Sequence, residues 1–221
     1  MEDIKANLAE IRKTLRDGVL LVAVTKTRSP QEINTAIEEG VTDIGENKVQ
    51  EILDKFDQVK PVKWHMIGHL QTNKVKYIID KVTMIHSVDS VKLAQEIDKR
   101  AAQKGINMDI LIQVNAAGEE SKFGIEPQKT GDVIKEILGT CPNIRIRGLM
   151  CIAPFAEDTN EIRKYFAEVK EQYDRYGRIE HERLNFRYLS MGMSHDYITA
   201  MEEGSNLVRV GSAIFGERSY N

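Results

Sequence analysis

The stretch Val19-Leu20-Leu21-Val22-Ala23-Val24-Thr25-Lys26 decides the fold of this chain. Its first six residues are all aliphatic or alanine, with no helical stripe, which is typical of a strand covered on both faces in a parallel sheet. Lys26 follows at the rim, where such a strand meets solvent. A partly desolvated amine at this position can attack an aldehyde and form a Schiff base. The alternative is an ordinary strand-end lysine with its charged head in water.

Composition places the chain among ordinary soluble proteins. Its 221 residues carry 31 basic and 34 acidic side chains and a net charge of -3, so we expect no nucleic-acid partner. The chain has no apolar stretch of membrane-spanning length and no secretory signal at its start, which predicts a cytoplasmic protein without membrane contact. We expect one domain over residues 1–221, with Cys141 and Cys151 as reduced structural thiols.

Short apolar runs alternate with longer amphipathic runs, which is the pattern of repeated strand-helix units. The predicted strands are Leu20–Thr25, Thr42–Gly45, Val62–Gly68, Thr83–Val88, Asp109–Asn115, Ile144–Cys151, Phe186–Ser190 and Leu207–Gly211. The helical patterns between them are Gln31–Glu39, Lys48–Asp57, Asn73–Ile79, Val91–Gln103, Pro127–Leu138, Thr159–Tyr176 and Asp196–Glu203. Eight strands with intervening helices predict an α/β fold, a single closed (β/α)8 barrel. An open doubly wound sheet is the alternative, because periodicity alone does not show closure.

An additional helix is predicted over Ile4–Arg16, before the first strand. Its apolar positions recur on one face at Ile4, Leu8, Ile11 and Leu15. Residues 212–221, after the last strand, are too few for a full eighth outer helix. We therefore expect the leading helix either to take that place or to cover an open end of the barrel.

Polar side chains gather where the predicted strands end, and in a barrel these ends form the active face. The segments concerned are Thr25-Lys26-Thr27, Gly45-Glu46-Asn47, His65-Met66-Ile67-Gly68-His69, Ser190-Met191-Gly192-Met193-Ser194 and Arg209-Val210-Gly211-Ser212. The last two are Gly- and Ser-rich turns, whose backbone N–H groups can approach an anion closely. Barrels commonly hold phosphate after their seventh and eighth strands. His65 and His69 lie on a strand running into a loop, so we expect no metal site there.

Closure of the barrel would place the eighth strand beside the first. A phosphate held by Gly211-Ser212 and Ser190-Met191, with help from the Ser194 hydroxyl, would then lie beside the amine of Lys26. Pyridoxal 5'-phosphate (PLP) carries an aldehyde and a phosphate at a suitable separation. Arg209 lies on the same strand face as Gly211 and can donate to the ring nitrogen. A cation there disfavours protonation of the ring and weakens its action as an electron sink.

Five segments of the chain resemble, in order, those of one known family. They are Val22-Ala23-Val24-Thr25-Lys26, Ile44-Gly45-Glu46-Asn47, His65-Met66-Ile67-Gly68-His69-Leu70-Gln71-Thr72-Asn73-Lys74, Leu189-Ser190-Met191-Gly192-Met193-Ser194 and Val208-Arg209-Val210-Gly211. The family is that of the YggS/PROSC pyridoxal phosphate homeostasis proteins. The resemblance implies a modified (β/α)8 barrel similar to the N-terminal domain of alanine racemase, with PLP as its cofactor.

The resemblance also implies roles for individual residues. Lys26 matches the Schiff-base lysine and Arg209 the arginine that faces the pyridine nitrogen. The other matches are Gly211 and Ser212 to the phosphate-binding turn, Ser190 and Met191 to a second phosphate loop, and Asn47 to a residue near the ring. One departure is a residue inserted between Lys26 and Pro30, and another is Ser212 in place of threonine. Neither removes the amine or the hydroxyl.

The resemblance implies a PLP carrier or buffer without an established reaction. A racemase needs two acid/base groups on opposite faces of the substrate carbon, and the chain offers no second β domain after Gly211 to supply one. We therefore predict a homeostasis protein rather than a turnover enzyme, a monomer that passes PLP to apo-enzymes. One alternative is a racemase or decarboxylase using Tyr197, His195 or His65. Another is a Schiff-base aldolase or sugar-phosphate isomerase.

Overall fold

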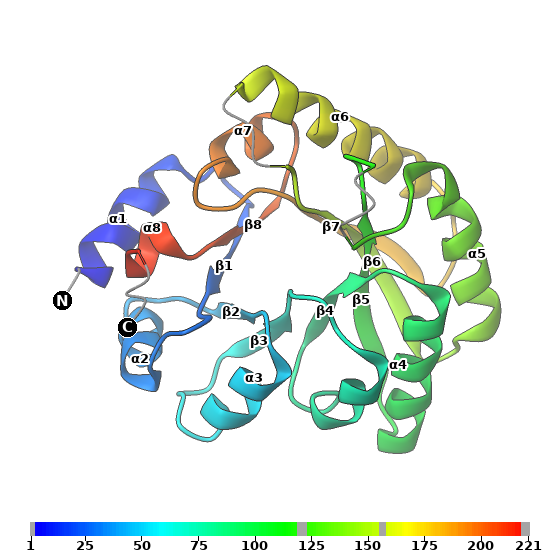
Figure 1. Cartoon of the computed structure of the whole chain (residues 1–221), viewed down its shortest axis with the longest axis horizontal. Helices are drawn as coiled ribbons and strands as arrows, with labels where there is room; N and C mark the ends of the chain where they lie inside the picture. The colour runs from blue at the N-terminus through cyan, green and yellow to red at the C-terminus, as the bar shows by residue number, and fades with distance from the viewer. Residues whose placement is uncertain (1–2, 119–122, 155–157, 218–221) are drawn as a thin grey trace.

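The structure, a computed structural model, describes residues 3–118, 123–154 and 158–217. Eight parallel strands close into a barrel in sequence order, with helices around it (Figure 1). The strands are β1 Leu20–Val24, β2 Asp43–Glu46, β3 Lys63–Met66, β4 Met84–Val88, β5 Met108–Val114, β6 Ile144–Cys151, β7 Leu184–Ser190 and β8 Leu207–Val210. The predicted (β/α)8 barrel is therefore confirmed.

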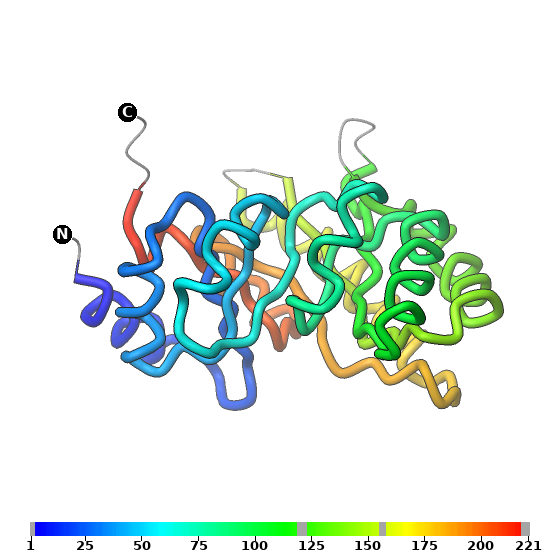
Figure 2. The backbone as a smooth tube through the Cα atoms, turned by 90° about the horizontal axis from the view of Figure 1, so that it is seen from below, coloured from blue at the N-terminus to red at the C-terminus, as the bar shows by residue number. Residues whose placement is uncertain are grey.

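Among the described residues, the outer layer consists of α-helices and two short 3-10 helices. The α-helices are α1 Ile4–Thr14, α2 Pro30–Glu38, α3 Val49–Lys55, α4 Val91–Lys104, α5 Thr130–Thr140, α6 Thr159–Tyr176, α7 Tyr197–Glu202 and α8 Ser212–Phe215. The 3-10 helices are η1 Thr72–Tyr77, where the sequence predicted a helix, and η2 Pro127–Lys129. Seen from the side, the helices form a ring that is wider than it is high (Figure 2). No helix in the described residues is long and apolar enough to cross a membrane.

The pairing of β1 with β8 closes the barrel. Leu20 lies opposite Leu207 and Val22 lies opposite Arg209 in parallel register. This pairing excludes the open doubly wound sheet, in which the first and last of these strands would not meet. It also carries the turn after β8 to the side of the turn after β1, as Figure 1 shows.

The leading helix α1 occupies the outside of the barrel beside α8 (Figure 1). Leu8 and Ile11 are buried on its inner face, and Asn7 Nδ2 donates to the backbone oxygen of Ile214 in α8 at 2.9 Å. Because α8 is only four residues long, α1 covers the surface that a longer eighth helix would cover. Of the two placements expected from the sequence, the structure therefore has the first.

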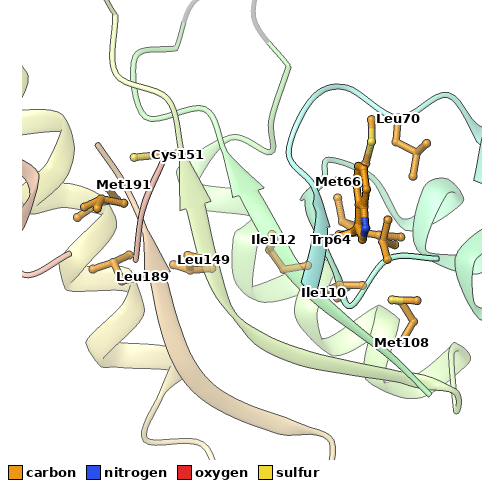
Figure 3. Packing of buried hydrophobic residues seen from close by; sticks show 14 of the residues in the cluster. Trp64, Met66, Leu70, Met108, Ile110, Ile112, Leu149, Cys151, Leu189 and Met191 are labelled. Carbon is orange, nitrogen blue, oxygen red and sulfur yellow. The ribbon is translucent and has the colours of Figure 1, made fainter. Parts of the chain in front are cut away.

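The apolar core lies mainly between the strands and the helices, not inside the barrel. Side chains that point outward from β3, β5, β6 and β7, such as Trp64, Ile112 and Leu149, pack in this layer (Figure 3). A second apolar cluster, separate from this layer, is small and consists of Met84, Leu111 and Met150 with Tyr188 packed against them. Polar side chains are also buried inside the barrel, and these support the site described next.

Candidate functional site

A cavity of about 370 Å³ opens at the carboxyl ends of the strands. Of the eight site residues predicted from the sequence, six line it: Lys26, Asn47, Ser194, Arg209, Gly211 and Ser212. They come from the ends of β1, β2 and β8 and from the loop after β7. The closure of the barrel is what brings them together, since Lys26 and Arg209 are far apart in sequence.

The turn that carries Lys26 is fixed on both sides. The Thr25 carbonyl accepts a hydrogen bond from Lys55 Nζ at 2.9 Å, and the Thr27 backbone N–H donates to Glu51 Oε2 at 2.6 Å. Thr27 has a φ of 65°, the only positive value at a non-glycine position in the described residues. A conformation that costs a non-glycine residue free energy is held by its surroundings. The half-buried Lys26 therefore leaves the backbone in a set direction.

A buried ion pair lies directly beneath this turn. Lys55 Nζ is 2.8 Å from Glu46 Oε1 and 2.8 Å from Glu51 Oε2, and the Thr25 hydroxyl donates to Glu46 Oε1 at 2.7 Å. Burial raises the pKa of Glu46, against the opposing effect of Lys55. Lys55 belongs to an amphipathic helix, where sequence alone indicates a solvated side chain. Its role in supporting the Lys26 turn emerges only from the fold.

The guanidinium of Arg209 is held in place by hydrogen bonds to buried acceptors. Its Nη1 donates to Ser190 O at 2.9 Å and to Ser190 Oγ at 2.6 Å, and its Nη2 donates to Cys151 O at 2.9 Å. Burial lowers the pKa of Arg209, although a guanidinium keeps its charge in proteins. Because Arg209 also lines the cavity, a fixed cation lies at the cavity wall.

Backbone N–H groups converge on an oxygen atom beside β8. The Ser194 hydroxyl oxygen accepts from the Gly211 N–H at 3.1 Å and from the Ala213 N–H at 3.4 Å. A Cβ at Gly211 would lie 3.2 Å from Val24 Cβ and 3.3 Å from its carbonyl oxygen, so the close approach of β8 to β1 favours glycine. Amides arranged in this way suit an anionic oxygen.

Ser190 and Met191 lie below the cavity instead of on its wall. Ser190 is fully buried and its polar atoms bind Arg209. Met191 points outward into the apolar layer, where it is fully buried. Successive residues of a strand face opposite sides, so one turns into the barrel and the other away from it. Their contact with phosphate stays a prediction, and neither side chain reaches the wall.

Several lining residues were not among the predicted site residues, including Arg28, His69, Gln113 and Phe123; of these four, only His69 belongs to a strand-end segment that the sequence placed at the active face. The His69 ring stacks on Phe123 with centroids 3.6 Å apart, and Gln113 Nε2 donates to the Phe123 carbonyl at 3.0 Å. Two signals could have found some of them. Arg28 follows Lys26 by two residues, and Gln113 is the polar member of the otherwise apolar run Ile110-Leu111-Ile112-Gln113-Val114.

The three acid/base candidates of the racemase alternative have different places. The Tyr197 hydroxyl is 2.8 Å from Thr14 Oγ1 of α1, in the outer layer. His65 is 1% exposed inside the barrel, with its Nδ1 2.9 Å from His86 Nε2. His195 lines the cavity. Only His195 of the three is therefore placed to meet a bound molecule.

Comparison with known proteins identifies the family. The model of the N-terminal domain of alanine racemase matches residues 1–219. The pyridoxal phosphate homeostasis protein of Aquifex aeolicus is 44% identical over 202 residues, which cover 90% of this chain and 87% of that protein. The human protein of the same name is 37% identical over 215 residues, which cover 91% and 77% respectively. The chain belongs to the family of pyridoxal phosphate homeostasis proteins. The family resemblance found in five sequence segments is thereby confirmed.

A solved structure has the same architecture. The structure of PipY from Synechococcus elongatus, solved with PLP bound, has a TM-score of 0.88 and 32% sequence identity to this chain. The match covers 97% of this chain and 100% of that one. The barrel described above is therefore shared with PipY.

Replacing Lys55 tests the buried support of the Lys26 turn. Lys55→Met leaves the fully buried Glu46 carboxylate without its cation, so we expect the free energy of unfolding to fall by about 3 to 5 kcal/mol. Lys60→Met is the matched control, since the Lys60–Glu38 pair is about half exposed and should contribute less than about 1 kcal/mol. Chemical denaturation measures both. Equal losses in the two variants would contradict a structural role for the Glu46–Lys55 pair.

Protonation of His86 should link stability to pH. Burial lowers the pKa of His86 well below its ordinary 6.5, and nearby His65 and Arg209 lower it further. Below pH 6.5 the unfolded chain therefore binds a proton that the folded chain does not, and stability is lost as the pH falls. One such group contributes a slope of up to about 1.4 kcal/mol per pH unit.

Urea denaturation across this pH range measures the effect. His86→Gln should have a shallower slope below pH 6.5 than the wild type, whereas replacing the exposed His181 in the same way should not. If His86→Gln had the same slope as the wild type, then His86 in the wild-type protein would take up its proton while folded, which would contradict this prediction.

Proposed function

We propose that this protein binds PLP in the cavity, bonded as a Schiff base to Lys26, and that it serves in PLP homeostasis as a carrier or buffer. The observation that carries the proposal is the placement of an amine, a fixed guanidinium and converging backbone amides around one cavity. The amine of Lys26 comes from the end of β1, and the guanidinium of Arg209 and the amides come from β8 and the turn that follows it. The PLP-bound structure of PipY supports the identity of the ligand.

The residues that line the cavity fit the three functional groups of PLP, which are its aldehyde, its phosphate and its ring nitrogen. Lys26 offers the amine for the aldehyde, and the Gly211 and Ala213 amides, with the hydroxyls of Ser194 and Ser212, offer donors for the phosphate. Arg209 offers N–H donors for the ring nitrogen. A cavity of about 370 Å³ is within the usual range for small-molecule sites. Asn47 lines the same cavity and is available to the ring substituents.

The arrangement of these residues supports retention of PLP more directly than catalytic turnover. The Lys26 amine adds to the aldehyde carbon, and water leaves as the carbon-nitrogen double bond forms. When bound, the cofactor supplies an electron sink whose strength depends on protonation of its ring nitrogen. The charge of Arg209 opposes that protonation. The site therefore retains the cofactor while limiting its reactivity.

A PLP-dependent racemase or decarboxylase is the second candidate, and His195 is the observation that favours it. His195 is the one member of the three acid/base candidates that lines the cavity with Lys26. Incubation with L- and D-amino acids, followed by optical rotation and carbon dioxide release, separates the two functions. We expect no sustained turnover. Turnover that is lost in both Lys26→Ala and His195→Phe would establish the enzyme and contradict the carrier.

Three further parts of the proposal concern the protein in the cell. It acts as a single-domain monomer in the cytoplasm and transfers PLP to apo-enzymes. The family name of its relatives supports a role in PLP supply. A purified apo-enzyme of the PLP-dependent class, mixed with the loaded protein under dilution, would report transfer as recovered activity.

Absorbance spectroscopy tests the role of Lys26. Wild-type protein reconstituted with PLP should be yellow and should carry the reduced cofactor on the Lys26 peptide after borohydride treatment. Lys26→Ala should lose the band, because no amine remains there to bond the aldehyde. Lys48→Ala, which removes an exposed lysine beside Asn47, should keep it. Reduced cofactor on another peptide, or a wild type that stays colourless, would contradict the proposal.

A further inference from the structure

A row of buried polar side chains crosses the interior of the barrel beneath the cavity. Each comes from a different strand, and the members are Asp43 of β2, His65 of β3, His86 of β4, Ser190 of β7 and Arg209 of β8. All are at most 4% exposed. Barrels of this type usually fill the interior with branched apolar side chains. Burying polar groups instead is costly unless each finds a hydrogen-bond partner.

Hydrogen bonds connect the row from end to end. Asp43 Oδ1 is 2.8 Å from His65 Nε2, and His65 Nδ1 is 2.9 Å from His86 Nε2. His86 Nδ1 is 3.2 Å from Ser190 Oγ, which is 2.6 Å from Arg209 Nη1. An anion therefore stands at one end of an unbroken chain and a cation at the other. We call these five residues the interior chain.

The chemistry of the two ends gives the interior chain one direction. Arg209 can only donate, so Ser190 Oγ accepts from it and has its own proton left to donate to His86 Nδ1. His86 must then carry its proton on Nε2 and donate to His65 Nδ1. His65 in turn carries its proton on Nε2 and donates to the carboxylate of Asp43. The Thr42 hydroxyl donates to the other carboxylate oxygen at 2.7 Å, and the pKa of Asp43 is lowered by these hydrogen bonds against the effect of burial.

The opposite direction leaves a proton without an acceptor. If the histidines donated toward Ser190, its oxygen would receive two donors, from His86 and Arg209. The Ser190 hydroxyl proton would then have no acceptor among the contacts of the described residues. Only the direction from Arg209 to Asp43 gives every proton of the interior chain a partner, and an unmet buried donor is costly.

This direction matters because Arg209 is a buried cation with uncharged partners. Its guanidinium binds two backbone carbonyls and one hydroxyl. A buried charge needs compensation, and hydrogen bonds in a chain polarise one another. The negative end of the interior chain is Asp43, which is also close to Lys63. The carboxylate of Asp196 acts directly on the charge of Arg209, and the interior chain connects Arg209 to a second carboxylate, Asp43, through three intervening side chains.

We propose that Asp43, His65 and His86 are positioning residues for Arg209, which hold its guanidinium at the cavity wall through a chain of hydrogen bonds donated in one direction. The consequence for the cofactor rests on the function proposed above. With Arg209 held from the interior, its remaining N–H groups would be kept in one place as donors for the ring nitrogen of PLP. Loosening any link should therefore change both retention of PLP and the spectrum of the lysine-bound ring.

Nitrogen NMR of the histidine rings, measured on the protein without cofactor, tests the direction of hydrogen-bond donation along the interior chain. In the wild-type protein, the hydrogen-bond pattern requires His65 and His86 each to carry one ring proton, on Nε2. Asp43→Asn removes the negative charge but keeps an oxygen acceptor, and Arg209 still donates at the other end, so the protons should stay on Nε2 while the Nε2 resonance of His65 shifts. A proton on Nδ1 of His86, or a charged His65, in the wild type would overturn the proposal.

Binding of PLP tests the positioning of Arg209. His86→Phe removes the hydrogen bonds of His86 to Ser190 and His65; it should raise the dissociation constant of PLP about tenfold, the loss expected for one neutral hydrogen bond, and shift the absorption maximum. His86→Gln keeps one donor and one acceptor and should restore most of both. His181→Gln, at an exposed histidine, should leave both unchanged.

The outcomes separate this inference from the proposed function. If the wild type binds no PLP, the proposed function fails, and the NMR measurement still decides the direction of the interior chain. If the wild type binds PLP and His86→Phe matches His181→Gln in affinity and absorption maximum, the positioning role fails while the function stands. Circular dichroism checks that each variant is folded. Should His86→Phe not fold, the comparison of Asp43→Asn with Asp109→Asn, a carboxylate paired with Arg145, makes the same test.

Discussion

The parallel pairing of β1 with β8 is the contact on which the rest of the structure depends. It places Val22 opposite Arg209 and Ala23 opposite Val210. The two strands are separated by almost the whole chain, so bringing them together costs loop-closure entropy. The strands and helices between them must therefore already be arranged so that β1 and β8 can meet. Once they pair, the amine after β1 and the amides after β8 share one cavity. Without that pairing the chain has two unconnected half-sites.

Two buried polar networks support the site, and they lie on opposite sides of the strands. The Glu46–Lys55 pair lies outside the barrel wall and fixes the turn that carries Lys26. The interior chain lies inside the wall and reaches Arg209. Both replace apolar packing with polar contacts that are costly when incomplete. Rigid support of this kind is what a binding site needs if its groups are to keep their spacing.

The outer parts of the fold follow the sequence closely, with differences that have local causes. The helix predicted over Asn73–Ile79 forms as the 3-10 helix η1, a tighter form common in short connectors. The predicted strand ends agree with the structure to within a few residues. Of the two placements expected for the leading helix, the place of a full eighth helix is the one observed, because its buried face with Leu8 and Ile11 needs an apolar surface to cover.

The sequence by itself determined the alternation of strands and helices and the candidates Lys26, Arg209 and Gly211. These depend on local chemistry, namely hydrophobic periodicity and the residue types that follow each strand. Only the tertiary structure decided that Lys55 and His86 are support residues and that Ser190 lies beneath the cavity. Their partners are distant in sequence. The direction in which each side chain points is set by strand pairing and burial, and a local sequence pattern does not determine these.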